Sequence, residues 1–312
     1  MPVTNHDAVQ RLLMKKSGQA LAFLAEECLA VGLGERLPTF TQFAQHSPFS
    51  RGTLQNAMAG LEEIGAVELV KRGHLGTFVT GKDTGLLMQC RGVRYLTGTM
   101  PLPYTKKYEG LATGLFHSFR QRGLDLDIAY IRGSEKRIQA VLGGRYDFAI
   151  TSQLAAQAAL QAGLPIQVRH SFGPGSYLTG QSIIFRDPAD SQVRDGMRIG
   201  IDTISLDHVR LTHAAVGQHQ VTYLPVNYSQ IMALIRDNQI DAAVWNIDNI
   251  LESQARVHYR PLELPDNQET AAVLVMAQAN PAMARVVDEF LDVEDILSQQ
   301  RKVVAGEIYP NY

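Results

Sequence analysis

Apolar and polar positions between residues 34 and 65 predict two short helices. Thr39 is a good N-cap and Gln42 follows three residues later, which predicts a first helix from about Phe40 to His46. Ser50 is placed to cap a second helix, which would carry one apolar stripe for a core. The stripe falls at positions i, i+3, i+4 and i+7 and consists of Leu54, Ala57, Met58 and Leu61. This spacing is typical of a helix-turn-helix.

Strand-like alternation then replaces the helical spacing. Val67–Val70 alternates as a strand, Arg72–Gly76 supplies a turn, and Thr77–Val79 returns as a second strand. Upstream, Val9–Leu13 and Ala20–Ala25 have helical apolar spacing. We therefore expect an α+β winged helix-turn-helix head over residues 1–82, in which the two strands form the wing.

The second helix of the head has short polar side chains on the face opposite its apolar stripe. A recognition helix meets base edges and phosphates with residues of this kind near its N-terminus. Double-stranded operator DNA is therefore the expected partner, and a winged helix that serves only protein contacts is the alternative. The predicted DNA-binding residues are Thr39, Ser50, Arg51, Thr53, Gln55, Asn56, Lys71, Arg72 and His74.

Composition changes this picture little. The formal net charge is −2 and 45% of the residues are hydrophobic, as in an ordinary globular protein. No apolar run approaches the roughly 20 residues of a membrane span, and the polar N-terminus lacks the order of a secretory signal. We therefore expect a cytoplasmic protein that has no membrane contact. Cys28 and Cys90 have no metal-ligand spacing and are expected to be buried free thiols.

The chain after residue 86 alternates between strand-like and helix-like segments, which predicts mostly parallel sheets covered by helices. The expected strands are Leu87–Cys90, Leu126–Ile131, Tyr146–Ile150, Met197–Ile201, Val221–Leu224 and Ile240–Val244. The expected helices are Tyr108–Arg122, Glu135–Leu142, Gln153–Gln161, Leu206–Val216, Ser229–Arg236 and Ile247–Gln254. Gly81–Gly85 is short, polar and flanked by glycine, so we expect it to be a linker.

These two series of segments have a similar order, which predicts two lobes. Ile138–Ile150 and Ile231–Val244 share one design, consisting of a helix, a tight turn, an Asp and a buried strand. Ser182–Phe185 and Tyr259–Leu262 are candidate crossings between the lobes. We expect an α/β two-lobed ligand-binding domain over residues 86–312, with lobe I at about 86–181 and 261–312 and lobe II at about 182–260.

The head resembles the winged helix of GntR-type transcriptional regulators through four linked pieces. These pieces are Leu37–Thr39, Ser50–Thr53, Leu61–Gly65 and Gly76–Val79. Two positions depart from the usual pattern of that family, because Thr41 and Gln55 stand where arginines are frequent. The resemblance implies DNA binding with fewer phosphate and guanine contacts, so affinity would rely on a dimer.

The two copies of the helix, turn and Asp pattern resemble type 2 periplasmic-binding-protein folds. The join of such a domain to a GntR-like head is similar to regulators of the YhfZ type. This resemblance covers nearly the whole chain and implies transcriptional control by a small ligand, but it supplies no identity for that ligand.

Ligands of open α/β lobes bind beyond the carboxyl ends of the strands, where helix N-termini carry a partial positive charge. Arg132 would suit an anionic effector, with a solvated arginine as the alternative. Trp245 is either a stacking wall or part of the core, and Gly173–Tyr177 is either a surface turn or a mobile segment at the cleft mouth. Ser and Thr at helix starts also act as plain N-caps. The predicted ligand-binding residues are Tyr104, Thr105, Arg132, Gly133, Ser134, Thr151, Ser152, Ser176, Asp202, Ser205, Asn227, Trp245 and Asn246.

The sequence contains no recognisable catalytic constellation. His208 and His213 are five residues apart, which misses the i, i+4 geometry of a two-histidine metal face, so neither a metal nor a cofactor is expected. No P-loop, dinucleotide fingerprint or nucleophile elbow is present. We therefore expect a ligand-responsive transcriptional regulator, with repression favoured and a homodimer as its assembly. The alternatives are a transferase or lyase of the two-lobed fold with a vestigial head, and a structural DNA-associated adaptor whose cleft is empty.

Overall fold

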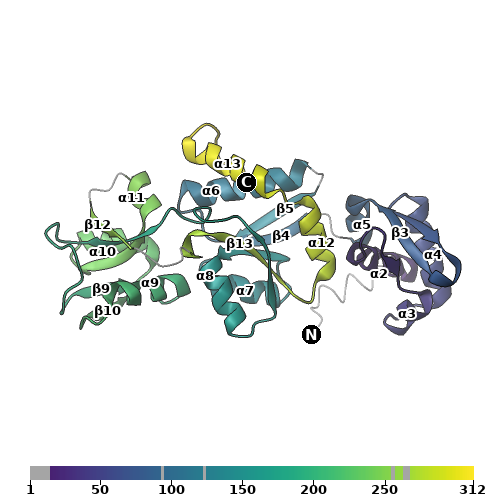
Figure 1. Cartoon of the computed structure of the whole chain (residues 1–312), viewed down its shortest axis with the longest axis horizontal. Coiled ribbons are helices and arrows are strands. Elements are labelled where there is room, and N and C mark those ends of the chain that lie inside the picture. Colours follow the sequence, from purple (N-terminus) through teal and green to yellow (C-terminus); the bar gives the residue numbers. More distant parts are fainter. Residues whose placement is uncertain (1–14, 93–94, 122–123, 254–256, 263–267) are drawn as a thin grey trace. The chain divides into compact units, whose positions relative to one another are not determined.

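The computed structural model of the chain describes residues 15–92, 95–121, 124–253, 257–262 and 268–312. The predicted helix at Val9–Leu13 lies outside these residues. The chain forms two compact units, and Figure 1 shows their elements. The first unit combines the N-terminal part, up to Leu96, with Asn280–Phe290. The predicted domain limits near residues 82 and 86 stay a prediction.

The first unit is a winged helix-turn-helix with additional helices. Its elements are α2 (Lys16–Ala30), β1 (Arg36–Leu37), α3 (Phe40–Gln45), α4 (Arg51–Glu63), β2 (Val67–Lys71), a 3-10 turn (Gly73–Leu75), β3 (Thr77–Lys82), α5 (Thr84–Arg91) and α12 (Pro281–Phe290). The three strands form an antiparallel sheet in the order β1-β3-β2. This arrangement confirms the expected head, including the wing.

The helix starts of the head follow the capping chemistry of the sequence. Thr39 and Gln42 form a complete capping box at α3, in which each side chain accepts a hydrogen bond from the backbone N–H of the other residue. Ser50 Oγ accepts from Thr53 N over 3.2 Å at the start of α4. The predicted apolar stripe of α4 is buried, and consists of Leu54, Ala57, Met58 and Leu61. Both helix predictions are therefore confirmed.

The segment expected to be a linker is regular structure instead. Gly81 and Lys82 belong to β3, and Asp83 caps α5 with a hydrogen bond from Leu86 N to Asp83 Oδ1 over 2.9 Å. The predicted strand Leu87–Cys90 is wrong, because these residues lie in α5. A short apolar run fits a strand and a buried helix equally well, and the Asp83 cap decides between them.

The two cysteines differ in burial. Cys28 is fully buried in α2, and burial raises the pKa of its thiol to about 12. Cys90 is half-buried in α5, so the expectation of two buried thiols is correct for Cys28 alone. Both are free thiols, as predicted.

Lobe I of the second unit is built on a five-stranded sheet in the order β5-β4-β6-β13-β7. Helices α6 and α13 cover one face of this sheet, and α7 and α8 cover the other (Figure 1). The elements are β4 (Tyr95–Met100), α6 (Lys106–Gln121), β5 (Asp125–Tyr130), α7 (Ser134–Leu142), β6 (Phe148–Ser152), α8 (Gln153–Gln161), β7 (Ile166–Ser171), a 3-10 turn (Gln268–Thr270), β13 (Ala272–Ala277) and α13 (Val293–Ala305).

Lobe II is built on a second five-stranded sheet, in the order β10-β9-β11-β8-β12. Its elements are β8 (Gln181–Phe185), β9 (Arg198–Ile201), α9 (Leu206–Val216), β10 (Thr222–Pro225), a 3-10 turn (Tyr228–Gln230), α10 (Ile231–Arg236), β11 (Ala242–Asn246), α11 (Ile247–Ser253) and β12 (His258–Pro261). The two predicted crossings are the paired strands β8 and β12 at one side of this sheet.

Both sheets of the lobes are mixed, which corrects the expectation of mostly parallel sheets. In lobe II, β11 pairs in parallel with β9 and antiparallel with β8. In lobe I, β6 pairs in parallel with β4 and antiparallel with β13. The antiparallel strands are those that enter a lobe from the other lobe or return to it, so they do not belong to the βα repeats from which the prediction was made.

Alternate residues of the strands of lobe II fill two separate cores. Ile183 and Phe185 of β8 pack with Val216 of α9 on one face of the sheet. Ile184 packs with Ile235 of α10 and Ile250 of α11 on the other. Burial on both faces explains the continuous apolar run Ile183–Phe185 in β8. Within the described residues, no helix is both long and apolar enough to cross a membrane.

Candidate functional site

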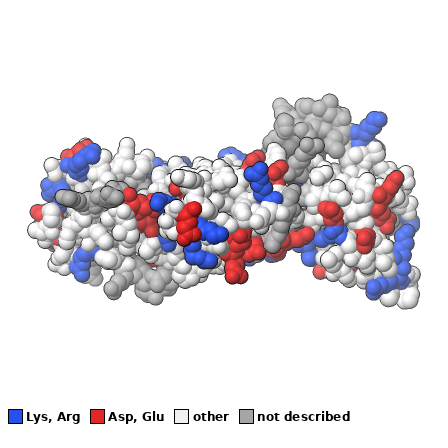
Figure 2. Space-filling model, turned by 90° about the horizontal axis from the view of Figure 1, so that it is seen from above, with Lys and Arg blue, Asp and Glu red and all other residues white. Residues whose placement is uncertain are grey.

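The polar face of α4 is exposed in the winged-helix unit. Arg51, Gln55 and Asn56 are exposed, and Thr53 is half-buried, with its hydroxyl paired with Ser50 Oγ over 2.8 Å. The hydroxyls at this helix start therefore order the helix, while the longer side chains beyond them are exposed. Figure 2 shows lysine and arginine side chains gathered along one edge of the head.

The wing carries three exposed polar residues at its turn, Lys71, Arg72 and His74. The Arg72 guanidinium lies 4.9 Å from the ring centroid of Phe78, which holds the charge against the sheet by a cation–π contact. A positioned cation at the tip of a wing suits a phosphate backbone.

A cavity of about 110 Å³ lies between the two lobes. Polar and aromatic side chains from both lobes form most of its wall. The polar and aromatic side chains from lobe I are Tyr104, Tyr108, Arg132, Ser134, Arg137 and Tyr177, beside the backbone of Gly133, and those from lobe II are Gln181, Asp202, Ser205, Asp207, His208, Tyr228, Asn246 and Asn249. The site is therefore complete only when the lobes are together.

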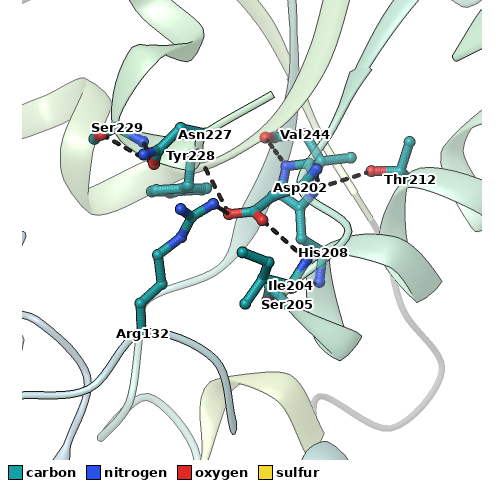
Figure 3. Close-up of polar contacts among 10 residues, drawn as sticks. All are labelled: Arg132, Asp202, Ile204, Ser205, His208, Thr212, Asn227, Tyr228, Ser229 and Val244. Carbon is teal, nitrogen blue, oxygen red and sulfur yellow. Dashed lines mark hydrogen bonds and ion pairs between the residues drawn. The ribbon is translucent and has the colours of Figure 1, made fainter. Parts of the chain in front are cut away.

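An ion pair between Arg132 and Asp202 joins the lobes at this cavity (Figure 3). Arg132 Nη2 lies 2.7 Å from Asp202 Oδ2, and the aspartate side chain is only 2% exposed. The backbone N–H groups of Ile204 and Tyr228 also donate to this carboxylate. Asp202 is consequently a fully engaged buried charge, and part of the guanidinium of Arg132 is committed to the protein itself.

His208 holds the backbone of Asp202 in place through a hydrogen bond. The N–H of Asp202 donates to His208 Nδ1 over 3.1 Å, so Nε2 carries the proton and donates to Val244 O over 2.9 Å. Burial lowers the pKa of His208, which favours this neutral form. The imidazole is therefore a fixed structural group that ties β9 to β11 (Figure 3).

Tyr228 stands between both lobes at the cavity wall. Its hydroxyl accepts from Asn246 N over 3.0 Å and donates to Asn249 Oδ1 over 3.1 Å. Asn249 Nδ2 in turn donates to the backbone oxygen of Tyr104 in lobe I over 3.1 Å. Burial raises the pKa of the Tyr228 phenol, so it remains a neutral hydroxyl. The Tyr228 ring lies 6.0 Å from that of Tyr104 and 5.8 Å from that of His208, measured between centroids.

A hydrogen bond between Ser152 and Asp207 is another contact that joins the lobes at the cavity. Ser152 Oγ, at the end of β6, donates to Asp207 Oδ2 of α9 over 2.5 Å. Burial raises the pKa of Asp207, although this hydrogen bond and the charges of Arg137 and Arg210 oppose the shift. The guanidinium of buried Arg137 donates to Ile131 O, Ile150 O and Tyr177 OH.

The N-terminus of α6 already has a carboxylate partner. Lys106 N lies 3.0 and 3.1 Å from the two oxygens of Glu252, which comes from α11 of lobe II. A carboxylate is stabilised at a helix N-terminus by the unpaired N–H groups and the helix dipole. Glu252 therefore occupies the helix start beside Tyr104 and Thr105, which the sequence predicted to contact a ligand.

Comparison with known proteins identifies the family of this chain. Residues 83–312 match the family described as the YhfZ C-terminal domain, and residues 32–79 match a helix-turn-helix domain. The chain belongs to the YhfZ family. The uncharacterized protein YhfZ of Escherichia coli (strain K12) is 30% identical over 310 residues, which cover 97% of this chain and 100% of that protein.

Several solved structures are similar to this YhfZ-family chain. The crystal structure of YhfZ from Shigella flexneri matches with a TM-score of 0.59 and 29% identity, over 70% of this chain and 94% of that one. A periplasmic substrate-binding protein of an ABC transporter from Coxiella burnetii matches with a TM-score of 0.47 and 12% identity, over 69% and 100% of the respective chains. The helix-turn-helix match is not specific to GntR-type regulators, so that narrower assignment stays a prediction.

The predicted ligand-binding residues separate into two groups by position. Seven line the cavity, namely Tyr104, Arg132, Gly133, Ser134, Asp202, Ser205 and Asn246. Six are not among its lining residues, namely Thr105, Thr151, Ser152, Ser176, Asn227 and Trp245. Whether the first group contacts a ligand stays a prediction.

The second group has structural positions that explain its absence from the cavity wall. Trp245 packs in the core between β11 and the helices α10 and α11. Ser176 Oγ donates to Gly173 O and accepts from Ala272 N, which fixes the Gly173–Tyr177 turn. Thr105 caps the start of α6. Asn227 caps the adjacent 3-10 turn and lines a neighbouring hollow instead.

Sequence reasoning missed several polar residues of the cavity wall: Tyr108, Arg137, Tyr177, Gln181, Asp207, His208, Tyr228 and Asn249. Most lie inside helices or strands and carry no motif of their own. The one available signal is that Asp207 is two residues beyond the Ser205 cap, because residues of a first helical turn lie beside the site that the helix start faces. Among the described residues, no group of three or more His, Cys, Asp or Glu side chains could hold a metal ion.

Proposed function

We propose that this chain is a DNA-binding transcriptional regulator controlled by a small effector, which binds in the cavity between the lobes. The observation that carries the proposal is α4, a capped helix whose polar face is exposed in a unit matched as a helix-turn-helix. Such a helix enters the major groove with its N-terminal residues at the base edges. Because DNA is the proposed partner, we also propose that the regulator acts in the cytoplasm.

The proposed contacts divide by chemistry. Arg51, Gln55 and Asn56 can read base edges, since amide and guanidinium groups make bidentate pairs with purines. Lys71, Arg72 and His74 of the wing can contact phosphates. Thr39, Ser50 and Thr53 lie at helix starts, where their hydroxyls cap the helices and the neighbouring backbone N–H groups can contact the DNA backbone.

The proposed control works through the closure of the lobes. The Arg132–Asp202 and Ser152–Asp207 contacts join the lobes beside the cavity, so an effector that prefers the closed form shifts the balance between open and closed protein. We propose repression as the output, since a protein bound over a promoter blocks transcription without any contact to polymerase. A homodimer would double the contacts of a head that offers few cations.

No reaction is assigned to the cavity. Both nitrogens of His208 are engaged with backbone groups of Asp202 and Val244, so the imidazole is not free to carry a proton to a ligand. This arrangement supports a binding role in preference to the alternative of a transferase or lyase.

The test is the affinity of full-length protein for DNA flanking its own gene, measured by fluorescence anisotropy. Arg51→Ala should weaken binding by about 1–3 kcal/mol, the range for a good bidentate contact. Lys136→Ala is the matched control, because Lys136 is an exposed cation on α7 of lobe I. Equal affinities of the wild type and Arg51→Ala would contradict the assignment of α4 as the recognition helix.

A further inference from the structure

Unpaired buried polar atoms gather at the cavity between the lobes. In the described part of the chain, seven buried side-chain nitrogen or oxygen atoms have no hydrogen-bond partner. Three of them belong to residues of this one cavity wall, namely Arg132 Nε, Gln181 Oε1 and Asp207 Oδ1. Because a buried polar group without a partner is costly, such a concentration indicates where a ligand supplies the missing bonds.

Asp207 is the most informative of the three atoms. Its Oδ2 accepts from Ser152 Oγ, while its Oδ1 is shielded from solvent and unpaired. A carboxylate oxygen can only accept a hydrogen bond, so its complement is a donor, and a charged donor gives the strongest bond. Gln181 Oε1 is likewise an acceptor. A ligand can therefore pair with Asp207 Oδ1 and Gln181 Oε1 only through hydrogen-bond donors.

The positive groups of the wall are mostly committed elsewhere. Arg137 donates to Ile131 O, Ile150 O and Tyr177 OH, and Arg132 Nη2 is paired with Asp202. Only Arg132 Nε is left as a buried unpaired donor on this wall among the described residues. Among the buried unpaired atoms of this wall, two are acceptors and one is a donor, whereas an anion would need donors from the protein.

The aromatic part of the wall agrees with a positively charged ligand. Tyr104, Tyr108, Tyr177 and Tyr228 all line the cavity. Ring faces attract a cation through their quadrupole, and this attraction strengthens when the cation is removed from water. Tyrosine rings, a carboxylate and an amide oxygen together suit an ammonium group.

We propose that the cavity binds a small ammonium compound of the amino-acid type, whose ammonium donates to Asp207 Oδ1 and Gln181 Oε1 and whose carboxylate accepts from Arg132 Nε. The inference rests on the proposed function only in naming this compound as the effector. The expectation of an anionic effector is thereby changed to a zwitterion.

Isothermal titration of the full-length protein with matched probes tests the chemistry. The probes are free amino acids, with alanine compared against propionate, which lacks the ammonium, and ethylamine, which lacks the carboxylate. We expect at least one amino acid to bind at millimolar concentration or better, and its ammonium-free counterpart to bind about 10- to 100-fold more weakly. Equal binding of the ammonium-free counterpart, or no binding by any amino acid, would overturn the proposal.

The affinity of Asp207→Asn for the amino acid that binds the wild type tests the role of Asp207. This change keeps the side-chain volume and removes the charge, so affinity should fall by about 10- to 100-fold. Asp237→Asn is the control, because Asp237 is exposed and pairs with Arg236 at the end of α10. Circular dichroism of both variants checks folding, and the probe series on the wild type tests the ligand chemistry without any variant. Unchanged affinity in folded Asp207→Asn would overturn the role of Asp207.

A DNA-binding measurement with the same probes separates this inference from the proposed function. If an amino acid binds and DNA affinity does not change, the inference stands and the effector role fails. If an anion without an ammonium changes DNA affinity through this cavity, the regulatory role stands and the inference fails.

Discussion

Asp202 is a buried carboxylate held by groups from both lobes. It follows β9 in lobe II, and its carboxylate is held by Arg132 from lobe I and by two backbone N–H groups. The sequence indicated both residues as ligand contacts, because both lie just beyond strands. Their pairing could not be predicted, since it depends on the approach of segments 70 residues apart.

Hydroxyl caps were predictable for the opposite reason. Thr39 and Ser50 accept hydrogen bonds from N–H groups three residues away, so both partners of each bond lie within one short segment of the sequence. Arg137 and Asp207 have partners that only the folded chain brings together. Local chemistry therefore predicted the head better than it predicted the cavity.

At the residue scale, His208 should make stability depend on pH. Its pKa is lowered by burial, so below about pH 6.5 the unfolded chain takes up a proton that the folded chain refuses. The free energy of unfolding is therefore highest above the pKa that His208 has in the unfolded chain. It falls as the pH drops towards the lower pKa of the folded chain, by up to about 1.4 kcal/mol per pH unit. Urea unfolding of the wild type and of His208→Gln at neutral and mildly acid pH measures this pH dependence of the free energy of unfolding.

The difference in the free energy of unfolding between the wild type and His208→Gln should become smaller as the pH falls. His213→Gln is the matched control, because His213 is an exposed histidine on the same helix. A wild-type advantage over His208→Gln that stays constant across the pH range would show that His208 is not held neutral by burial.

At the scale of elements, helices that begin after a clear cap were predicted well, and so were the buried strands β6, β9 and β11, but one central strand was missed. The helix predictions at Gln153–Gln161 and Leu206–Val216 agree with α8 and α9. β13 was not predicted, although it is the strand between β6 and β7. It is an unbroken apolar run without alternation, and such a run has no periodicity that separates a strand from a buried helix.

The packing of α6 on α13 depends on glycine. A Cβ atom on Gly114 would lie 2.5 Å from Ile296 O and 2.8 Å from Ile296 Cα, both on the backbone of α13. Gly114→Ala should therefore force the helices apart and lower the free energy of unfolding by about 1–3 kcal/mol, the usual range for overpacking. Thermal or urea unfolding measures this loss.

Gly52 of α4 provides the opposite case for comparison. No atom lies within 4 Å of a Cβ placed there, so Gly52→Ala should stabilise the helix by about 0.5–1 kcal/mol. Equal effects of the two substitutions would mean that backbone entropy, and not the contact between α6 and α13, determines the role of Gly114.

At the scale of the whole molecule, α12 connects the two compact units along the chain. It packs against α2 within the winged-helix unit, where Arg285 pairs with Glu35 over 3.1 Å and Thr84 Oγ1 donates to Glu289 Oε2 over 2.7 Å. In sequence, however, α12 lies between β13 and α13 of lobe I. A change in lobe I thus has a direct covalent route to the head. This route is additional to the connection after β3, where the sequence predicted a linker, and no local pattern in the sequence indicates it, because α12 lies far beyond α5 along the chain.

The central claim, that the winged helix is a DNA-binding surface, is tested most directly by the salt dependence of binding. Affinity of full-length protein for DNA flanking its own gene is measured over a series of salt concentrations, for the wild type and for Lys71→Ala/Arg72→Ala. Each lost phosphate contact reduces the slope of log affinity against log salt by about 0.9, so we predict a slope smaller by about two units. A slope identical to that of the wild type, or no DNA binding by the wild type, would contradict the account.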